Sequence, residues 1–451
     1  MTAQKTAAPP GRLRFVQAWV LLLILLSPSA WMIATIPPLW RDSDAYNQLV
    51  QDPLVATFWG HGAAYCHLAK VPLLLGELLE NSAPPSTTST PRTGQPGLTD
   101  TGVALLILGQ HLALAGAAFY FLTAITSIFW VRLAMALAWG TISLFYTFAH
   151  CVGSESLSLI LIVLLVGAAI RLVASRDEGS WRDWWVFASA LTGCLLSRHI
   201  NLCLVALLPG ALVLSWILKG IQRRFFVRTL SPGSAGTDLR KVFLAVIIVL
   251  AAFATAHFTV QGLARKTRYH PHSRLGYTFL WRLRFIDDLA PQSRSALLQR
   301  LTTETKSEDA RKLLSLLNQM QAEGSTFQDW GSFMRRGIEF FGGSMHWEKL
   351  DGALNQMAYT FLIPPGPEIK AVAFRDLRFG LGASSADVTS YLFDTTSYYF
   401  SHKADMIGCE KLTPFRDHTS EQISSLPSRY SYFQFGAKWT YDKVFAAWSI
   451  A

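Results

Sequence analysis

Seven long apolar segments fill most of the first 263 residues, and they constrain the fold more than any other feature. A helix needs roughly 20 mainly apolar residues to cross about 30 Å of hydrocarbon. The 51% share of hydrophobic residues also exceeds that of an ordinary soluble domain. We therefore predict an all-α polytopic membrane protein. The segments are residues 15–36, 103–126, 128–148, 157–173, 184–196, 202–221 and 242–263.

Two of these segments allow a second interpretation. Residues 15–36 follow basic residues, as the apolar part of a cleaved signal peptide does, but the run is longer than the roughly 7–15 residues typical of such peptides. We favour an uncleaved first span. Residues 184–196 are short and reach the next segment through the polar residues 197–201, so a re-entrant hairpin is the alternative there.

Lys and Arg are distributed unequally between the two sets of loops that alternate along the chain. Cytoplasmic loops are usually the richer in these residues. We therefore expect the N-terminus in the cytoplasm and residues 264–451 on the outside, and we attribute the net charge of +10 to membrane orientation rather than nucleic-acid binding. The basic set holds Lys5, Arg12, Arg14, Arg132, Arg171, Arg176, Arg182, Lys219, Arg223, Arg224, Arg228, Arg240 and Lys241, whereas the opposite set holds Arg41, Lys70, Arg92 and Arg198.

Composition divides the chain into a transmembrane domain, residues 1–263, and a mainly helical soluble region, residues 264–451. The first outer loop, residues 37–101, is long. Within it, residues 63–79 are apolar but interrupted by charge and proline, which is typical of a helix lying in the membrane interface. The five cysteines show no CxxC or metal-ligand spacing, so we predict neither a disulfide framework nor a zinc site.

Two carboxylates, Asp42 and Asp44, follow the Pro37-Pro38 break after the first apolar segment. At a membrane surface such a pair can supply a general base for a hydroxyl acceptor, or help to hold a divalent cation on a phosphate. The other interpretation is structural. Asp42 or Ser43 would then cap the start of a helix.

Glu155 and Arg198 fall in two further outer loops. A carboxylate beside hydrocarbon usually faces a wet cavity or a partner. In the other interpretation, Ser154 caps the N-terminus of a helix and Glu155 stabilises that terminus through the helix dipole. Arg198 could grip a phosphate, with His199 assisting as acid, base or donor. Its alternative role is a snorkelling arginine in a hairpin. Because the loop count puts both loops on the face of Asp42, the combination suits a lipid-phosphate substrate.

Other chemical signals are weaker or absent. His111, inside the second apolar segment, is best interpreted as a core histidine or a helix–helix hydrogen bond. The sequence contains no GxxxxGK[ST] loop, no HExxH and no GxSxG motif. A nucleotide-driven pump or a membrane metalloprotease is therefore disfavoured.

Taken together, four motifs resemble the GT-C superfamily of integral-membrane glycosyltransferases, which use polyprenyl-phosphate sugars and include the dolichyl-phosphate-mannose protein mannosyltransferases. The motifs are DSDAY at 42–46, QH at 110–111, SESL at 154–157 and SRHIN at 197–201, and the resemblance covers residues 12–263.

The resemblance implies an inverting transfer from a lipid-linked sugar donor to an extracytoplasmic acceptor. Asp42 or Asp44 would be the catalytic base, Glu155 a supporting acidic group and Arg198 a contact to the donor phosphate. Tyr46, His111 and His199 would complete the substrate-binding set. The family sometimes also uses a divalent cation, and any Mg²⁺ or Mn²⁺ in this chain would be held by Asp42 and Asp44.

The chain also departs from the family pattern. Many members continue with several spans after the seventh, where this sequence becomes soluble, and Ser43 separates acidic residues that are adjacent in the protein mannosyltransferases. The alternative function is therefore a non-enzymatic membrane protein whose outer domain binds a partner or supports envelope assembly.

Overall fold

The computed structural model describes most of the chain in two compact units. Unit 1 comprises residues 1–267 and 384–451, and unit 2 comprises residues 268–383. The described residues are 11–40, 63–81, 99–175, 180–225, 234–267, 291–323, 330–342, 347–362, 370, 392–394, 396–398, 412–413 and 417–426.

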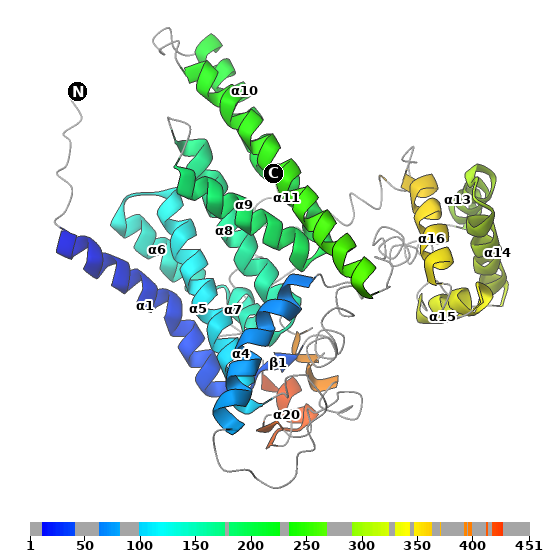
Figure 1. The fold of residues 1–451 in the computed structure, drawn as a ribbon, viewed down its shortest axis with the longest axis horizontal. Helices are drawn as coiled ribbons and strands as arrows, with labels where there is room; N and C mark the ends of the chain where they lie inside the picture. The colour runs from blue at the N-terminus through cyan, green and yellow to red at the C-terminus, as the bar shows by residue number, and fades with distance from the viewer. Residues whose placement is uncertain are drawn as a thin grey trace. The chain divides into compact units, whose positions relative to one another are not determined.

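Unit 1 is a bundle of apolar helices (Figure 1). Among the described residues, five helices are long and apolar enough to cross a membrane, or six if one bent pair counts as a span. This agrees with an all-α membrane protein. The five lie within α1 (Gly11–Thr35), α5 (Asp100–Ile125), α8 (Ser154–Ala174), η1 (His199–Ala206) continuing into α10 (Leu207–Phe225), and α11 (Ser234–Thr267).

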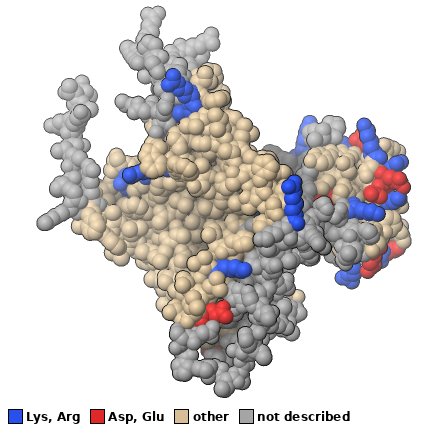
Figure 2. All heavy atoms as spheres, in the orientation of Figure 1, with Lys and Arg blue, Asp and Glu red and all other residues tan. Residues whose placement is uncertain are grey.

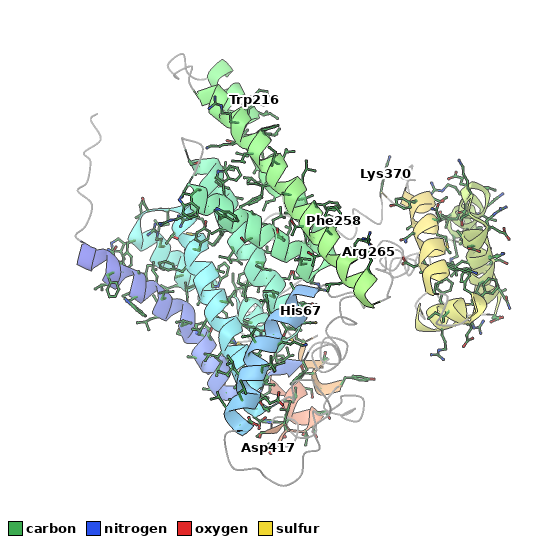
Figure 3. The ribbon with its side chains drawn as sticks, in the orientation of Figure 1. His67, Trp216, Phe258, Arg265, Lys370 and Asp417 are labelled. Atoms are coloured by element: carbon green, nitrogen blue, oxygen red, sulfur yellow. The ribbon has the colours of Figure 1, made fainter. Side chains whose placement is uncertain are left out.

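The surface of unit 1 has the character of a membrane-embedded bundle. Figure 2 shows a face that is nearly free of charged side chains over these helices. Trp216 on α10 and Phe258 on α11 point outward, with 56% and 71% of their surface exposed (Figure 3). Large apolar side chains in such positions have a suitable environment in lipid.

Two of the seven predicted spans take a different form. The predicted span 128–148 is the bent pair α6 (Phe129–Gly140) and α7 (Ser143–Ala149), whose axes meet at 67°. The bend falls at Gly140, the residue type that favours a helix interior least after proline. The predicted span 184–196 is α9 (Trp181–Ser197), which has 17 residues and is about 26 Å long, shorter than the ~30 Å hydrocarbon core. A total of seven spans remains a prediction.

A helix also forms in the first outer loop, where the interfacial helix was predicted. This helix, α4 (Ala63–Asn81), packs antiparallel to the start of α5, because Tyr65 lies beside Gln110 and Gly76 beside Gly102. A Cβ added to Gly76 would lie 2.2 Å from the Gly102 nitrogen, so the close approach requires glycine there.

Two short strands break the helical pattern. The strand β1 (Leu39–Trp40) pairs in parallel with β2 (Cys151–Val152), with Leu39 opposite Cys151 and Trp40 opposite Val152. Proline has no backbone N–H and disfavours helix in the residue before it, so Pro37-Pro38 ends α1 and leaves the chain extended.

The C-terminal residues divide between the units differently from the predicted single region 264–451. Residues 384–451 group with the membrane helices. Their buried apolar side chains share a core with β1, α1 and α5, and this shared burial explains the grouping. These side chains are Leu392, Phe393, Leu412, Ile423 and Leu426.

Unit 2 is helical, as predicted for this part of the chain, and it has a hydrophobic core of its own. The core includes Leu313, Leu317, Leu350 and Met357, all at most 2% exposed. On the face shown in Figure 2, basic and acidic side chains are interspersed over the surface of this unit. Its helices are α13 (Pro291–Glu304), α14 (Glu308–Ala322), α15 (Trp330–Phe340) and α16 (Trp347–Leu362).

Candidate functional site

Polar side chains of the bundle gather toward opposite ends of α8. At its C-terminal end, Arg171 donates to Thr123 Oγ1 at 2.7 Å and Lys241 Nζ donates to the Ser175 carbonyl at 2.6 Å. Glu155 occupies the first turn. At 1.5 Å per residue, Glu155 and Arg171 are roughly 24 Å apart along the helix axis.

These two groups correspond to the two loop sets of the sequence. Arg171 and Lys241 belong to the loops predicted to be cytoplasmic, whereas Glu155 and Arg198 belong to the opposite set. The structure therefore brings together residues that the loop count placed on one side. The direction in which the bundle crosses a membrane remains a prediction.

Glu155 and Arg198 form an ion pair in which the guanidinium donates to the carboxylate. Their side chains are 8% and 22% exposed. Glu155 comes from the first turn of α8, and Arg198 is the residue that ends α9. Gly153, rather than Ser154, occupies the N-cap position of α8, and no side chain caps this helix. The predicted cap at Ser154 was therefore wrong.

Gln110 fixes the backbone that leads into Glu155. Its Nε2 donates to the carbonyls of Ala149 and Cys151 at 2.9 and 3.1 Å. Its Oε1 accepts hydrogen bonds from Ser156 Oγ at 2.8 Å and from the Tyr65 hydroxyl at 3.2 Å. One buried amide thus holds β2, α8 and α4 together, and a satisfied polar network of this kind makes a site rigid.

The Tyr65 hydroxyl also accepts a hydrogen bond from the Gly153 N–H at 3.0 Å. Burial raises the pKa of Tyr65 above its ordinary value, so the phenol stays neutral and keeps its proton. It can then donate to Gln110 while it accepts from Gly153. This arrangement anchors the first turn of α8 to the helix of the outer loop.

Two buried histidines form a hydrogen-bonded chain beside this network. His150 Nε2 lies 2.8 Å from the Ile36 carbonyl, which can only accept, so this nitrogen carries the proton in the neutral ring. His150 Nδ1 then accepts from His111 Nε2 at 3.1 Å, and His111 Nδ1 accepts from the Ser29 hydroxyl at 2.9 Å. The chain links α1, α5 and the end of α7.

These contacts favour the structural interpretation of His111. The residue is 1% exposed, and both ring nitrogens have partners within the protein. A contact to substrate, which the resemblance implied, would require one of these hydrogen bonds to break.

Asn201 fixes the turn that follows Arg198. Its Nδ2 donates to Ser158 Oγ at 2.9 Å and to the Cys194 carbonyl at 2.9 Å. The backbone N–H of Asn201 donates to the Arg198 carbonyl at 3.1 Å. The break between α9 and η1 is therefore tied to α8, which keeps Arg198 beside Glu155.

Several predicted site residues lie outside the described residues. These are Asp42, Asp44 and Tyr46, and the side chain of His199 on η1 is also not described. Among the described residues, no cluster of three or more His, Cys, Asp or Glu could hold a metal ion. The predicted cation ligands, Asp42 and Asp44, are not part of that search.

Sequence reasoning missed Tyr65, His150 and Ser29 as parts of the network, and it included Asn201 in the SRHIN motif without giving it a role. Each is a polar residue within or beside an apolar segment, and this is the signal that could have identified them. Of the four cysteines in the described part of the chain, Cys66, Cys151 and Cys194 are buried and Cys203 is exposed.

The fold and the polar network define a helical membrane protein with a buried ion pair at one end of its bundle. No protein-family model, curated protein or solved structure matches the chain.

Proposed function

We propose that the protein is a membrane glycosyltransferase that moves a sugar from a polyprenyl-phosphate donor to an extracytoplasmic acceptor. The observation that carries the proposal is the Glu155–Arg198 ion pair next to the β1–β2 strand pair. The ion pair supports the proposal that acidic residues and an arginine able to bind phosphate meet at one end of the bundle.

The pairing of β1 with β2 also supports this proposal, because each strand is followed within a few residues by an acidic motif. Trp40 lies opposite Val152, and Glu155 follows Val152 by three residues. Asp42 follows Trp40 by two residues in the sequence, a chain length that spans at most about 7 Å. Trp40, the last described residue before the DSDAY motif, therefore lies beside the strand that leads into α8.

The proposed roles follow from the chemistry of these side chains. An arginine has five N–H donors in a planar fork, so Arg198 can contact a phosphate oxygen in addition to Glu155. Asp42 or Asp44 takes the proton of the acceptor hydroxyl as the acceptor oxygen attacks the anomeric carbon. The bond from that carbon to the phosphate oxygen breaks, and polyprenyl phosphate leaves as an anion.

A divalent cation at Asp42 and Asp44 would stabilise the negative charge of the departing phosphate. Glu155 holds Arg198 in place. The basic end of the bundle, with Arg171 and Lys241, would then face the cytoplasm, and the Glu155 end the outside.

A transfer assay tests the proposed base. The full-length protein in nanodiscs would be incubated with polyprenyl-phosphate mannose, glucose or galactose, each labelled in the sugar, and a solubilised membrane extract as the source of acceptors. Changing Asp42 and Asp44 together to Asn is expected to reduce transfer by about 10²–10⁴-fold.

The matched control is Asp309→Asn, which removes an exposed carboxylate from α14 in unit 2. This variant should retain the transfer rate of the unmodified protein. Full transfer by the double Asn variant would rule out the proposed base. The non-enzymatic alternative predicts no transfer from any of the three donors.

A further inference from the structure

Thr396, in the C-terminal part of unit 1, forms hydrogen bonds with the backbone of β1. Its hydroxyl accepts a hydrogen bond from the Trp40 N–H at 2.9 Å and lies 3.0 Å from the Trp40 carbonyl. It also lies 2.7 Å from the Leu392 carbonyl, one turn back on its own segment. The contact joins positions 356 residues apart in the sequence.

The surroundings of this contact are buried. Thr396 and Leu392 are fully buried, and Trp40 is 1% exposed. At a position buried from solvent, losing a hydroxyl that accepts from a backbone N–H removes a hydrogen bond that solvent cannot readily replace.

His150 holds the other end of the same short segment. Its Nε2 donates to the Ile36 carbonyl at 2.8 Å, and its carbonyl accepts from the Leu39 N–H at 3.0 Å. Residues 36–40 are thus held by His150 at one end and by Thr396 at the other. The next residues along the chain are Arg41 and Asp42.

We propose that Thr396 is a positioning residue for the proposed transfer reaction, because it fixes the strand from which the DSDAY motif emerges. This inference rests on the proposed function. In this role the C-terminal segment acts through the backbone of Trp40, two residues before Asp42 in the sequence, and no residue of that segment needs to contact the sugar. A displacement of about 1 Å at a reacting group can cost about 100-fold in rate.

Two substitutions distinguish the effect of the Thr396 hydroxyl from the effect of the side chain's volume. Thr396→Val keeps the volume and removes the hydroxyl, whereas Thr396→Ser keeps the hydroxyl and removes a methyl group. Both would be studied in the full-length protein by transfer from the labelled polyprenyl-phosphate sugars and by amide hydrogen exchange of the peptide that contains Trp40.

Thr396→Val is expected to speed exchange at the Trp40 amide by at least tenfold and to lower kcat by about tenfold. KM for the donor should change less than twofold, because Arg198 and its neighbours are unaltered. Thr396→Ser should resemble the unmodified protein in both measurements. A role in packing alone would instead impair Thr396→Ser as well, through the lost methyl group, and would leave no selective effect on the Trp40 amide.

The inference is overturned if Thr396→Val shows the exchange and kcat of the unmodified protein, or if both variants are impaired equally. If Thr396→Val fails to fold, amide hydrogen exchange at Trp40 is measured in the unmodified protein instead. Rapid exchange there would overturn the inference, because an amide that donates to Thr396 should be protected. If the unmodified protein transfers no sugar but Thr396→Val still speeds Trp40 exchange selectively, the proposed function fails while the backbone contact stands.

Discussion

Arg198, at the end of α9, donates to Glu155, in the first turn of α8, across 43 residues of sequence. The pair joins two helices at one end of the bundle. Because Glu155 is only 8% exposed, the attraction between the two charges offsets part of the hydration that the carboxylate loses on burial.

Removing one partner of this pair should destabilise the protein more than removing both. Glu155→Gln leaves the Arg198 charge without its carboxylate and is expected to cost about 3 kcal/mol, near the lower limit for buried pairs because Arg198 is 22% exposed. The double variant Glu155→Gln with Arg198→Gln should cost less than Glu155→Gln alone, because it leaves no charge without its partner. Thermal unfolding of the four proteins in detergent gives the coupling energy, and strict additivity would contradict the pairing.

The buried His150 should make stability fall in acid. Burial lowers the pKa of His150 to about 4, so the folded state favours the neutral ring. The neutral ring therefore contributes about 3 kcal/mol to the free energy of unfolding. This contribution is fully present above the unfolded-state pKa near 6.5 and is lost as pH falls toward 4.

The corresponding measurement compares thermal unfolding from pH 7.5 to pH 4.5 for the unmodified protein and His150→Asn, which cannot titrate in this range. The unmodified protein should lose more stability than the variant. Parallel curves would show that the His150 environment differs from the one described.

The contact between α4 and α5 should tolerate no side chain at Gly76. Gly76→Ala places a methyl group 2.2 Å from the Gly102 nitrogen, and helix backbones cannot yield as a flexible side chain can. We expect a loss of about 1–3 kcal/mol. Gly109→Ala is the matched control on α5, since a Cβ there meets nothing within 4 Å. The control should unfold at or above the original temperature, and equal losses for the two variants would argue against the close crossing.

The Tyr65 hydroxyl should stabilise the first turn of α8, and this effect can be separated from that of the aromatic ring. Tyr65→Phe keeps the ring and removes the acceptor of the Gly153 N–H, at an expected cost of about 1–3 kcal/mol. Tyr359→Phe, on the exposed side of α16, should have no effect. The measurement is again thermal unfolding, and an unchanged Tyr65→Phe protein would contradict the hydrogen bond.

The helices were largely predictable from sequence, because apolar runs of about 20 residues leave a chain few alternatives. The loop count also placed Glu155 and Arg198 on one side. Their direct pairing was not predictable, since it depends on the way α8 and α9 pack. The bend between α6 and α7 was missed because Gly140 interrupts a run that is apolar on both sides.

Two other features had no sequence signal. The strands β1 and β2 have two residues each, too few for an alternating pattern. Thr396 bonds Trp40 through one hydroxyl across most of the chain, and neither composition nor periodicity indicates such a contact. The buried polar network was visible only as separate polar residues near apolar segments. Its hydrogen bonds required the packed structure.

The proposed function requires the end of the bundle at Glu155 and Arg198 to bind a lipid-linked sugar. Native mass spectrometry of the protein purified from its membrane measures the lipids bound to it, with Arg198→Lys as the comparison, since lysine keeps the charge but loses the planar fork. We predict that a polyprenyl-phosphate sugar co-purifies with the unmodified protein and is depleted at least tenfold in Arg198→Lys. Bulk phospholipids alone on both proteins, or a polyprenyl-phosphate sugar bound equally to both, would contradict it.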